Sequence, residues 1–108
     1  MAELEGGASH ATVELSTDDA GPPVITLTGE IDMSNVVVVE DRLQAMLSGA
    51  RERVVIDVSS LTFIDSSGIA VLLRASEKSQ RFELRNPSSM IKRIIEATGL
   101  SEVLQVEL

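Results

Sequence analysis

The stretch RVVIDVSSLTFIDSSGIAVLLRA, residues 53–75, carries the strongest structural signal in this chain of 108 residues. Its first part, RVVIDVSS, is apolar on both faces, which predicts a central strand covered on both sides. Ser59 and Ser60 are expected in a turn, followed by a short strand over LTFI and a helix from about Ser66. Asp65 is suited to cap that helix, because its carboxylate accepts hydrogen bonds from the free amides of the first turn.

The segments before this stretch predict a hairpin and a further helix. Residues 12–16, TVELS, and 24–31, VITLTGEI, alternate apolar and polar side chains as half-exposed strands do, and TDDAGPP between them is a turn signal. The segment MSNVVVVEDRLQAMLSGA is ambiguous, since four valines favour a strand while its apolar residues fall at helical spacing. We predict a helix there. Ser34 or Asp32 can cap its start, and Gly49 can end it.

The segments after it predict a strand, a helix and a last strand. RFELRN, residues 81–86, is strand-like, and EVLQVEL closes the chain. NPSSMIKRIIEATGL between them has an apolar stripe and the start and stop signals of a helix, which are Asn86 or Ser88 as cap, Pro87 in the first turn and Gly99 as the stop. We therefore predict an α/β fold with a mixed sheet of about four to five strands, preceded by a hairpin and covered by three or four helices. Residues 11–108 are expected to form a single domain after a flexible tail over residues 1–10.

Composition argues against several classes of function. Nine Lys and Arg against seventeen Asp and Glu give a formal net charge of -8, which opposes binding to nucleic acid and to anionic lipid. The chain has no cysteine for a disulfide or a thiolate metal site, and its apolar runs are too short to cross a bilayer. We expect a cytoplasmic protein with no metal, no cofactor and no direct membrane insertion.

The helix from Ser66 is expected to present small and polar residues to solvent. At about 100° per residue, its sheet-facing stripe is predicted to hold Ile69, Leu72, Leu73 and Ser76. Its outward face is predicted to hold Ser67, Val71, Arg74 and Lys78, with Ser66 and Ala70 at the flank. Such a face would let a partner approach closely over Gly68 and Ala70.

The order of these segments resembles the STAS domain family. The hairpin, GEID, the valine-rich helix, VVIDVSSLTFIDSSGIAVLL and ELRNPSSMIKRIIEATGL follow one another as they do in STAS domains, from about Thr12 to the C-terminus. This family comprises anti-sigma factor antagonists and the cytoplasmic domains of sulfate transporters. The resemblance implies a STAS-like fold and a small bacterial regulator.

In antagonists of this family the serine directly after the motif's aspartate is phosphorylated by the anti-sigma factor, which is a serine/threonine kinase with its own bound ATP. The resemblance places that serine at Ser66, with Ser67 as the competing position. Unphosphorylated antagonist binds the anti-sigma factor and frees the sigma factor, and a phosphatase restores that state. The residues that the resemblance and the helix face together assign to the partner surface or its rim are Glu30, Asp32, Asp65, Ser67, Gly68, Ala70, Val71 and Arg74.

An enzyme and a non-enzymatic subunit of a larger complex are the two alternative functions. An enzyme that used Ser66 or Ser67 as nucleophile would need a base, but the only histidine, His10, is expected in the tail, and neither G-x-S-x-G nor a phosphate-binding loop occurs. We therefore expect no enzyme activity. The closer alternative is a non-enzymatic STAS subunit of a transport complex or a stress-signalling scaffold.

Overall fold

The computed structural model describes residues 3–6, 9–16, 23–47, 51–104 and 106–107. Their strands form one six-stranded sheet in which spatial order follows chain order. The strands are β1 (Glu3–Gly6), β2 (Ser9–Ser16), β3 (Val24–Ile31), β4 (Arg51–Ile64), β5 (Ser79–Arg85) and β6 (Val106–Glu107). The helices are α1 (Val36–Met46), α2 (Ser66–Ser76) and α3 (Ser89–Thr98).

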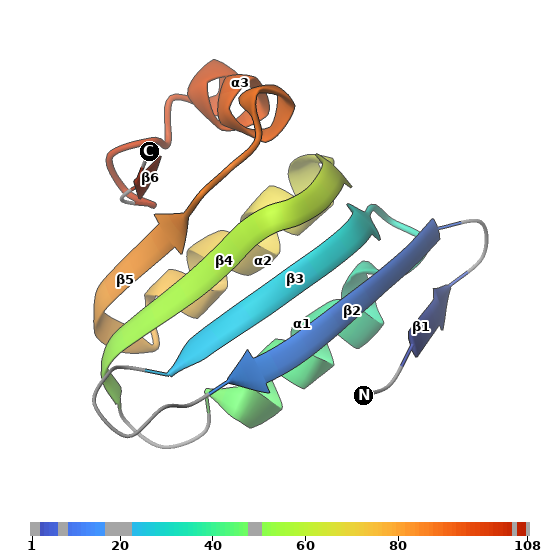
Figure 1. Cartoon of the computed structure of the whole chain (residues 1–108), viewed down its shortest axis with the longest axis horizontal. Coiled ribbons are helices and arrows are strands. Elements are labelled where there is room, and N and C mark those ends of the chain that lie inside the picture. Colours follow the sequence, from blue (N-terminus) through green and yellow to red (C-terminus); the bar gives the residue numbers. More distant parts are fainter. Residues whose placement is uncertain (1–2, 7–8, 17–22, 48–50, 105, 108) are drawn as a thin grey trace.

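The sheet is mixed, as predicted. β1, β2 and β3 are antiparallel neighbours, whereas β3, β4, β5 and β6 run parallel to one another. Figure 1 shows α1 and α2 behind the sheet and α3 beside the upper end of β4. The predicted hairpin, β2 and β3, is confirmed, but it is part of the sheet instead of preceding it.

β4 is the central strand and is longer than the sequence predicts. It pairs with β3 on one side and β5 on the other, so the expected central position is confirmed. The predicted turn at Ser59 and Ser60 is wrong, because both residues lie within the strand. Two shifts in register against β3 each place one extra residue on β4, and the Asp57 carboxylate accepts hydrogen bonds from the backbone and the hydroxyl of Ser59 at the first shift.

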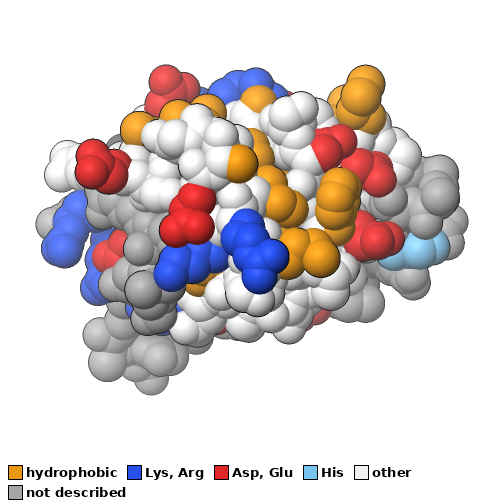
Figure 2. All heavy atoms as spheres, turned by 90° about the horizontal axis from the view of Figure 1, so that it is seen from above, with side chains coloured by type: hydrophobic (Ala, Val, Ile, Leu, Met, Phe, Trp, Pro, Cys, Tyr) orange, Lys and Arg blue, Asp and Glu red, His pale blue; other side chains and the backbone are white. Residues whose placement is uncertain are grey.

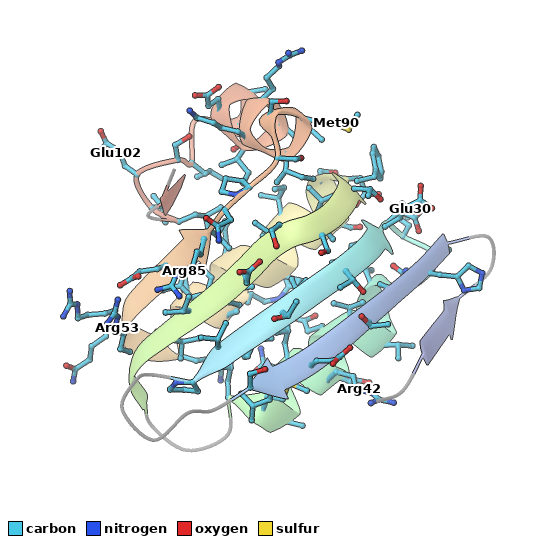
Figure 3. All side chains as sticks on the ribbon, viewed as in Figure 1. Glu30, Arg42, Arg53, Arg85, Met90 and Glu102 are labelled. Atoms are coloured by element: carbon cyan, nitrogen blue, oxygen red, sulfur yellow. The ribbon has the colours of Figure 1, made fainter. Side chains whose placement is uncertain are left out.

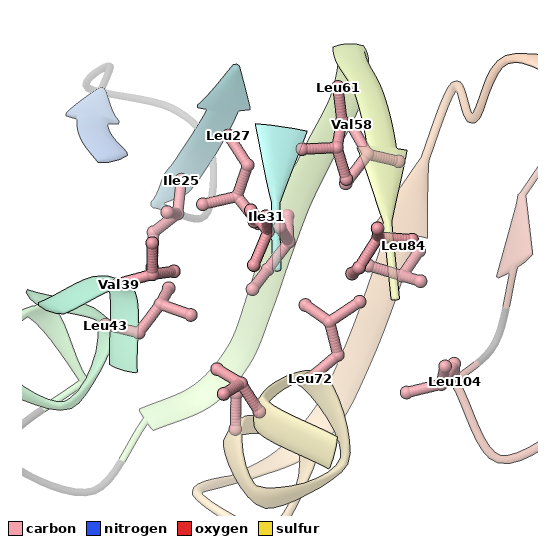
Figure 4. Close-up of a cluster of buried hydrophobic side chains, with 14 of the residues drawn as sticks. Ile25, Leu27, Ile31, Val39, Leu43, Val58, Leu61, Leu72, Leu84 and Leu104 are labelled. Atoms are coloured by element: carbon pink, nitrogen blue, oxygen red, sulfur yellow. The ribbon is translucent and has the colours of Figure 1, made fainter. Parts of the chain in front are cut away.

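The core lies between the sheet and the helices (Figure 4). Val39 and Leu43 of α1 are fully buried and lie near Ile25 of β3, while Leu72 is buried on α2. The helix predicted over the valine-rich segment is therefore confirmed. Packing of one apolar stripe outweighs the preference of valine for strands, because most helix stability in a protein comes from such burial.

The ends of the helices correct two expectations and confirm a third. Neither Ser34 nor Asp32 caps α1, since the N-cap residue is Asn35, whose side chain binds the Glu30 carbonyl at 2.8 Å and the Asp32 amide at 3.1 Å. Asn35 thus fixes the turn that leads from β3 into α1. Gly49, expected to end α1, lies outside the described residues. Before α3, the cap is Ser88 and Pro87 precedes it, while the predicted stop at Gly99 is confirmed by its left-handed backbone.

The two ends of the chain also differ from the prediction. Glu3–Gly6, expected within a flexible tail, forms β1 and pairs with the start of β2. A short strand of this kind is stabilised by backbone hydrogen bonds to its neighbour and leaves no apolar pattern to recognise. The predicted last strand over residues 102–108 is reduced to β6, after a turn over residues 101–104.

An ion pair joins β4 to β5 at Arg53 and Glu83. The Arg53 guanidinium donates to the two carboxylate oxygens of Glu83 at 2.9 and 3.1 Å. Glu83 is buried, and these hydrogen bonds hold its pKa below the ordinary value against the opposing effect of burial. The nearby charges of Arg85 and Arg81 act in the same direction.

Acid should therefore weaken the fold partly through Glu83. Its pKa is lower in the folded state than in the unfolded chain, so its contribution is present above the unfolded value of 4.5 and is lost as the pH falls through the folded value. We expect Glu83→Gln to be less stable than the wild type at about pH 7, and the difference to shrink below about pH 4. Urea unfolding across this range measures the difference, and a difference independent of pH would contradict the assignment.

Candidate functional site

β3 and β4 end side by side, and the start of α2 is held against the end of β3. Ile31 and Ile64 are partners in the register, and the backbone N–H of Asp65 donates to the Ile31 carbonyl at 3.2 Å. Asp32 and Asp65, the first residues after the two strands, therefore lie at one edge of the sheet, which we call the carboxyl edge. Figure 1 shows this edge at the upper right, beside α3.

Asp65 caps α2, as the sequence predicts. Its Oδ1 atom accepts hydrogen bonds from the backbone N–H groups of Ser67 at 2.9 Å and Gly68 at 3.1 Å. The same oxygen accepts a hydrogen bond from the Ser67 hydroxyl at 2.5 Å. One carboxylate oxygen thus organises the first turn of the helix and occupies two of its free amides.

The two adjacent serines differ in their surroundings. Ser67 is partly buried and its hydroxyl is bound to Asp65. Ser66 is exposed, and its hydroxyl has no hydrogen bond to any residue that the structure describes. Because a kinase needs an accessible hydroxyl that can turn toward ATP, this geometry favours Ser66 over Ser67 as the acceptor of a phosphate.

Gly68 and Val71 are buried within the domain, so the prediction that Val71 lies on the solvent-facing side of α2 is wrong, and Gly68 is not part of an exposed face. Val71 is buried together with Ile69, Leu72 and Ala75, because α2 packs against α1 as well as against the sheet. Gly68 is buried too, and a Cβ atom there would lie 2.5 Å from the Ile64 side chain. The glycine therefore serves the close packing of α2 on β4. Ala70, at an intermediate exposure, remains at the flank as predicted.

Arg74 is exposed, as predicted, but its guanidinium is already engaged. It binds both carboxylate oxygens of Glu40 on α1, one of them, Oε1, from Nη2 at 2.9 Å. This contact lowers the pKa of the Glu40 carboxyl below its ordinary value. The pair joins α1 to α2, so a partner would have to compete with Glu40 for Arg74.

Glu30 and Asp32 lie at the carboxyl edge with Ser66, and the structure thus brings these three predicted site residues together. Glu30 is exposed near the end of β3 (Figure 3) and is the register partner of Phe63 on β4. The Asp32 carboxylate accepts hydrogen bonds from the Ser34 amide at 2.9 Å and the Ser34 hydroxyl at 2.6 Å. Both residues lie next to Ile31, whose carbonyl accepts the hydrogen bond from the backbone of Asp65.

Comparison with known proteins identifies the family of this chain. The family model described as "Mlab, STAS domain" matches residues 4–106. The chain belongs to the STAS domain family. The resemblance seen in its sequence is thereby confirmed.

The relatives of this STAS domain include anti-sigma factor antagonists. The anti-sigma-F factor antagonist RsfB of Mycobacterium tuberculosis is 28% identical over 92 residues, which cover 82% of this chain and 75% of that protein. An anti-sigma factor antagonist from Mycobacterium paratuberculosis has a crystal structure with a TM-score of 0.80 and 27% identity, covering 89% of this chain and 84% of that one. SpoIIAA from Bacillus in its phosphorylated form, at 23% identity, shares the fold, with a TM-score of 0.63 over 90% of this chain and 92% of that one.

Four exposed hydrophobic side chains of the STAS domain were missed by the sequence analysis. They are defined here as the apolar cluster, which consists of Met33, Val37, Phe63 and Met90. Phe63 is exposed next to buried Ile64, because the register shift after Leu61 leaves two consecutive exposed residues on β4. Figure 2, which views the molecule from above Figure 1, shows hydrophobic side chains exposed on this face, with both acidic side chains and Lys or Arg side chains beside them.

Other kinds of site find little support in the described part of the STAS domain. No group of three or more His, Cys, Asp or Glu residues there could hold a metal ion. His10 was expected in the tail, but it lies in β2 and is exposed. It does not activate Ser66 through a hydrogen bond, since the described residues offer none to that hydroxyl. Among the described helices, none has the length and apolar character to span a membrane.

Proposed function

We propose that this STAS domain is a non-enzymatic anti-sigma factor antagonist controlled by phosphorylation of Ser66. In its unphosphorylated form it binds an anti-sigma factor with serine/threonine kinase activity in the cytoplasm, and a sigma factor is released. The partner supplies the ATP and transfers phosphate to Ser66, and a phosphatase reverses the modification. The observation that carries this proposal is the exposed, unengaged hydroxyl of Ser66 beside a serine whose hydroxyl is bound to Asp65.

The start of α2 explains why a phosphate would act at an interface and not on the fold. A phosphoserine adds about −1.5 to −2 charges and three acceptor oxygens. The amides of Ser67 and Gly68, which would favour an anion, already donate to Asp65. The phosphate would therefore stand in solvent beside the Asp65 carboxylate, and the native structure would persist.

A partner that covers Ser66 would lose affinity when this phosphate is present. Binding would remove water from a dianion, and the carboxyl edge offers it the repulsion of Asp65, Asp32 and Glu30. The names of the relatives agree with this proposal, because RsfB is an antagonist of an anti-sigma factor.

Binding to candidate partners tests the proposal. The purified domain is added to the anti-sigma kinases encoded in its own genome, with and without ATP, and complexes are detected by size-exclusion chromatography. We expect a complex with one kinase that dissociates on prolonged incubation with ATP. A complex only with a membrane transporter ATPase would favour the alternative of a transport subunit and would contradict the proposed function.

A further inference from the structure

The apolar cluster converges on the carboxyl edge from four segments. Met33, Val37 and Met90 are the most exposed large hydrophobic side chains that the structure describes, at 81, 68 and 54%. They come from the turn before α1, from α1 and from the start of α3, while Phe63 stands near the end of β4. Figure 3 shows Met90 close to the end of β4, with Glu30 on the other side of that end.

The core of the domain is complete without the four side chains of the apolar cluster. The core already holds a continuous set of side chains from the sheet and the three helices. Exposed hydrophobic side chains that gather in one place, rimmed by polar groups, mark interaction surfaces in soluble proteins. The cluster is also continuous with the proposed phosphorylation site, because Phe63 is two residues before Asp65 and Met33 directly follows Asp32.

The charge around the cluster indicates the chemistry of its partner. Residues 29–37 and 61–70, which build the carboxyl edge, contain Glu30, Asp32 and Asp65 and no Lys or Arg, whereas Lys92 and Arg93 follow Met90 on α3. A complementary surface would place apolar side chains at its centre and basic side chains where its rim meets Glu30 and Asp32. An unmodified serine hydroxyl at Ser66 fits beside such an apolar centre, whereas a phosphate there would lose its water without a cation to pair with.

We propose that the apolar cluster anchors the anti-sigma factor, through a partner surface with an apolar centre and with Lys and Arg side chains opposite Glu30 and Asp32. The inference rests on the proposed function and adds which residues provide the affinity. Met33 and Met90 supply flexible, exposed side chains that bury well in an apolar pocket. Ser66 then acts as the switch within a surface whose affinity comes from its apolar neighbours.

Isosteric polar substitutions test this division of roles. The affinity of the anti-sigma factor is measured by calorimetry for the wild type, Met33→Gln and Met90→Gln. We expect each variant to bind about tenfold more weakly, since buried anchors dominate the energy of an interface. Leu15→Gln is the matched control, because Leu15 is exposed on β2 and pairs with Ile25, at the opposite end of β3 from Ile31. This control should bind like the wild type.

Methyl NMR of methionine-labelled protein gives a second readout that needs no variant. On addition of the anti-sigma factor, the signals of Met33 and Met90 should shift, whereas that of the partly buried Met46 should not. If the wild type binds but the two glutamine variants bind equally well and the two signals stay unchanged, the inference fails and the proposed function stands. If the wild type binds no anti-sigma factor, both fail.

Discussion

Ser66→Asp is expected to weaken binding to the anti-sigma factor at least on the order of a hundredfold, which corresponds to about 3 kcal/mol. The substitution places a carboxylate where the structure has an exposed hydroxyl beside Asp65. In the complex this carboxylate would lose its water and would lie beside Asp65. Residues 61–70 contain no Lys or Arg that could pair with it. Calorimetric titration with the purified partner measures the change.

Ser66→Asn is the matched control for size, because asparagine has the shape of aspartate without its charge. We expect this variant to bind within about tenfold of the wild type. Both variants should unfold at nearly the wild-type temperature, since Ser66 is exposed and no other described residue depends on its hydroxyl. If Ser66→Asn and Ser66→Asp lost equal affinity for the anti-sigma factor, the size of the side chain and not its charge would govern binding at this site.

Gly29→Ala is expected to destabilise the fold strongly. Gly29 has a φ of +87°, and a Cβ atom at this position would lie 2.1 Å from the carbonyl oxygen of His10 on β2. The left-handed backbone costs an alanine about 1 kcal/mol, and the clash with backbone adds roughly 1–3 kcal/mol, because neither strand can move freely in the sheet. The melting temperature should fall by roughly 10–25 °C, as calorimetry or circular dichroism would measure.

Gly99→Ala separates the cost of the left-handed backbone from the cost of the clash between strands. Gly99 has a similar φ of +76°, but a Cβ atom there has no other group within 4 Å. We expect a loss of only about 1 kcal/mol from the backbone conformation. If Gly29→Ala proved no more destabilising than Gly99→Ala, the close approach of β2 to β3 would not be the reason for the glycine.

Patterns that depend on burial predicted the fold well. The alternation of β2 and β3, the doubly apolar β4 and the capped helix α2 all follow from which side chains meet the core. The valine-rich α1 was the difficult case, and the spacing of Val39 and Leu43 was a better guide than residue preference.

Features that depend on neighbours distant in the sequence were not predicted. The two extra residues of β4 are visible only against β3, and β1 exists only through its pairing with β2. Val71 was assigned to solvent because a single-helix projection considers the sheet alone, whereas α1 covers a second face of α2. Helix packing therefore limits what can be inferred about an outer face from periodicity.

The sequence located the candidate site but did not distinguish between its two serines. The DSSG segment marks the start of α2, yet the two serines are equivalent as letters and differ only through the hydrogen bond of Ser67 to Asp65. The apolar cluster was missed because its members lie in four separate segments that meet only after folding.

Mapping the phosphate tests the central claim most directly. The domain is incubated with its anti-sigma kinase and ATP, and the modified residue is identified by mass spectrometry in the wild type, Ser66→Ala and Ser67→Ala. We predict one phosphate on Ser66 in the wild type, none in Ser66→Ala, and Ser66 still modified in Ser67→Ala. A phosphate on Ser67 in the wild type, or modification that persists in Ser66→Ala, would contradict the account.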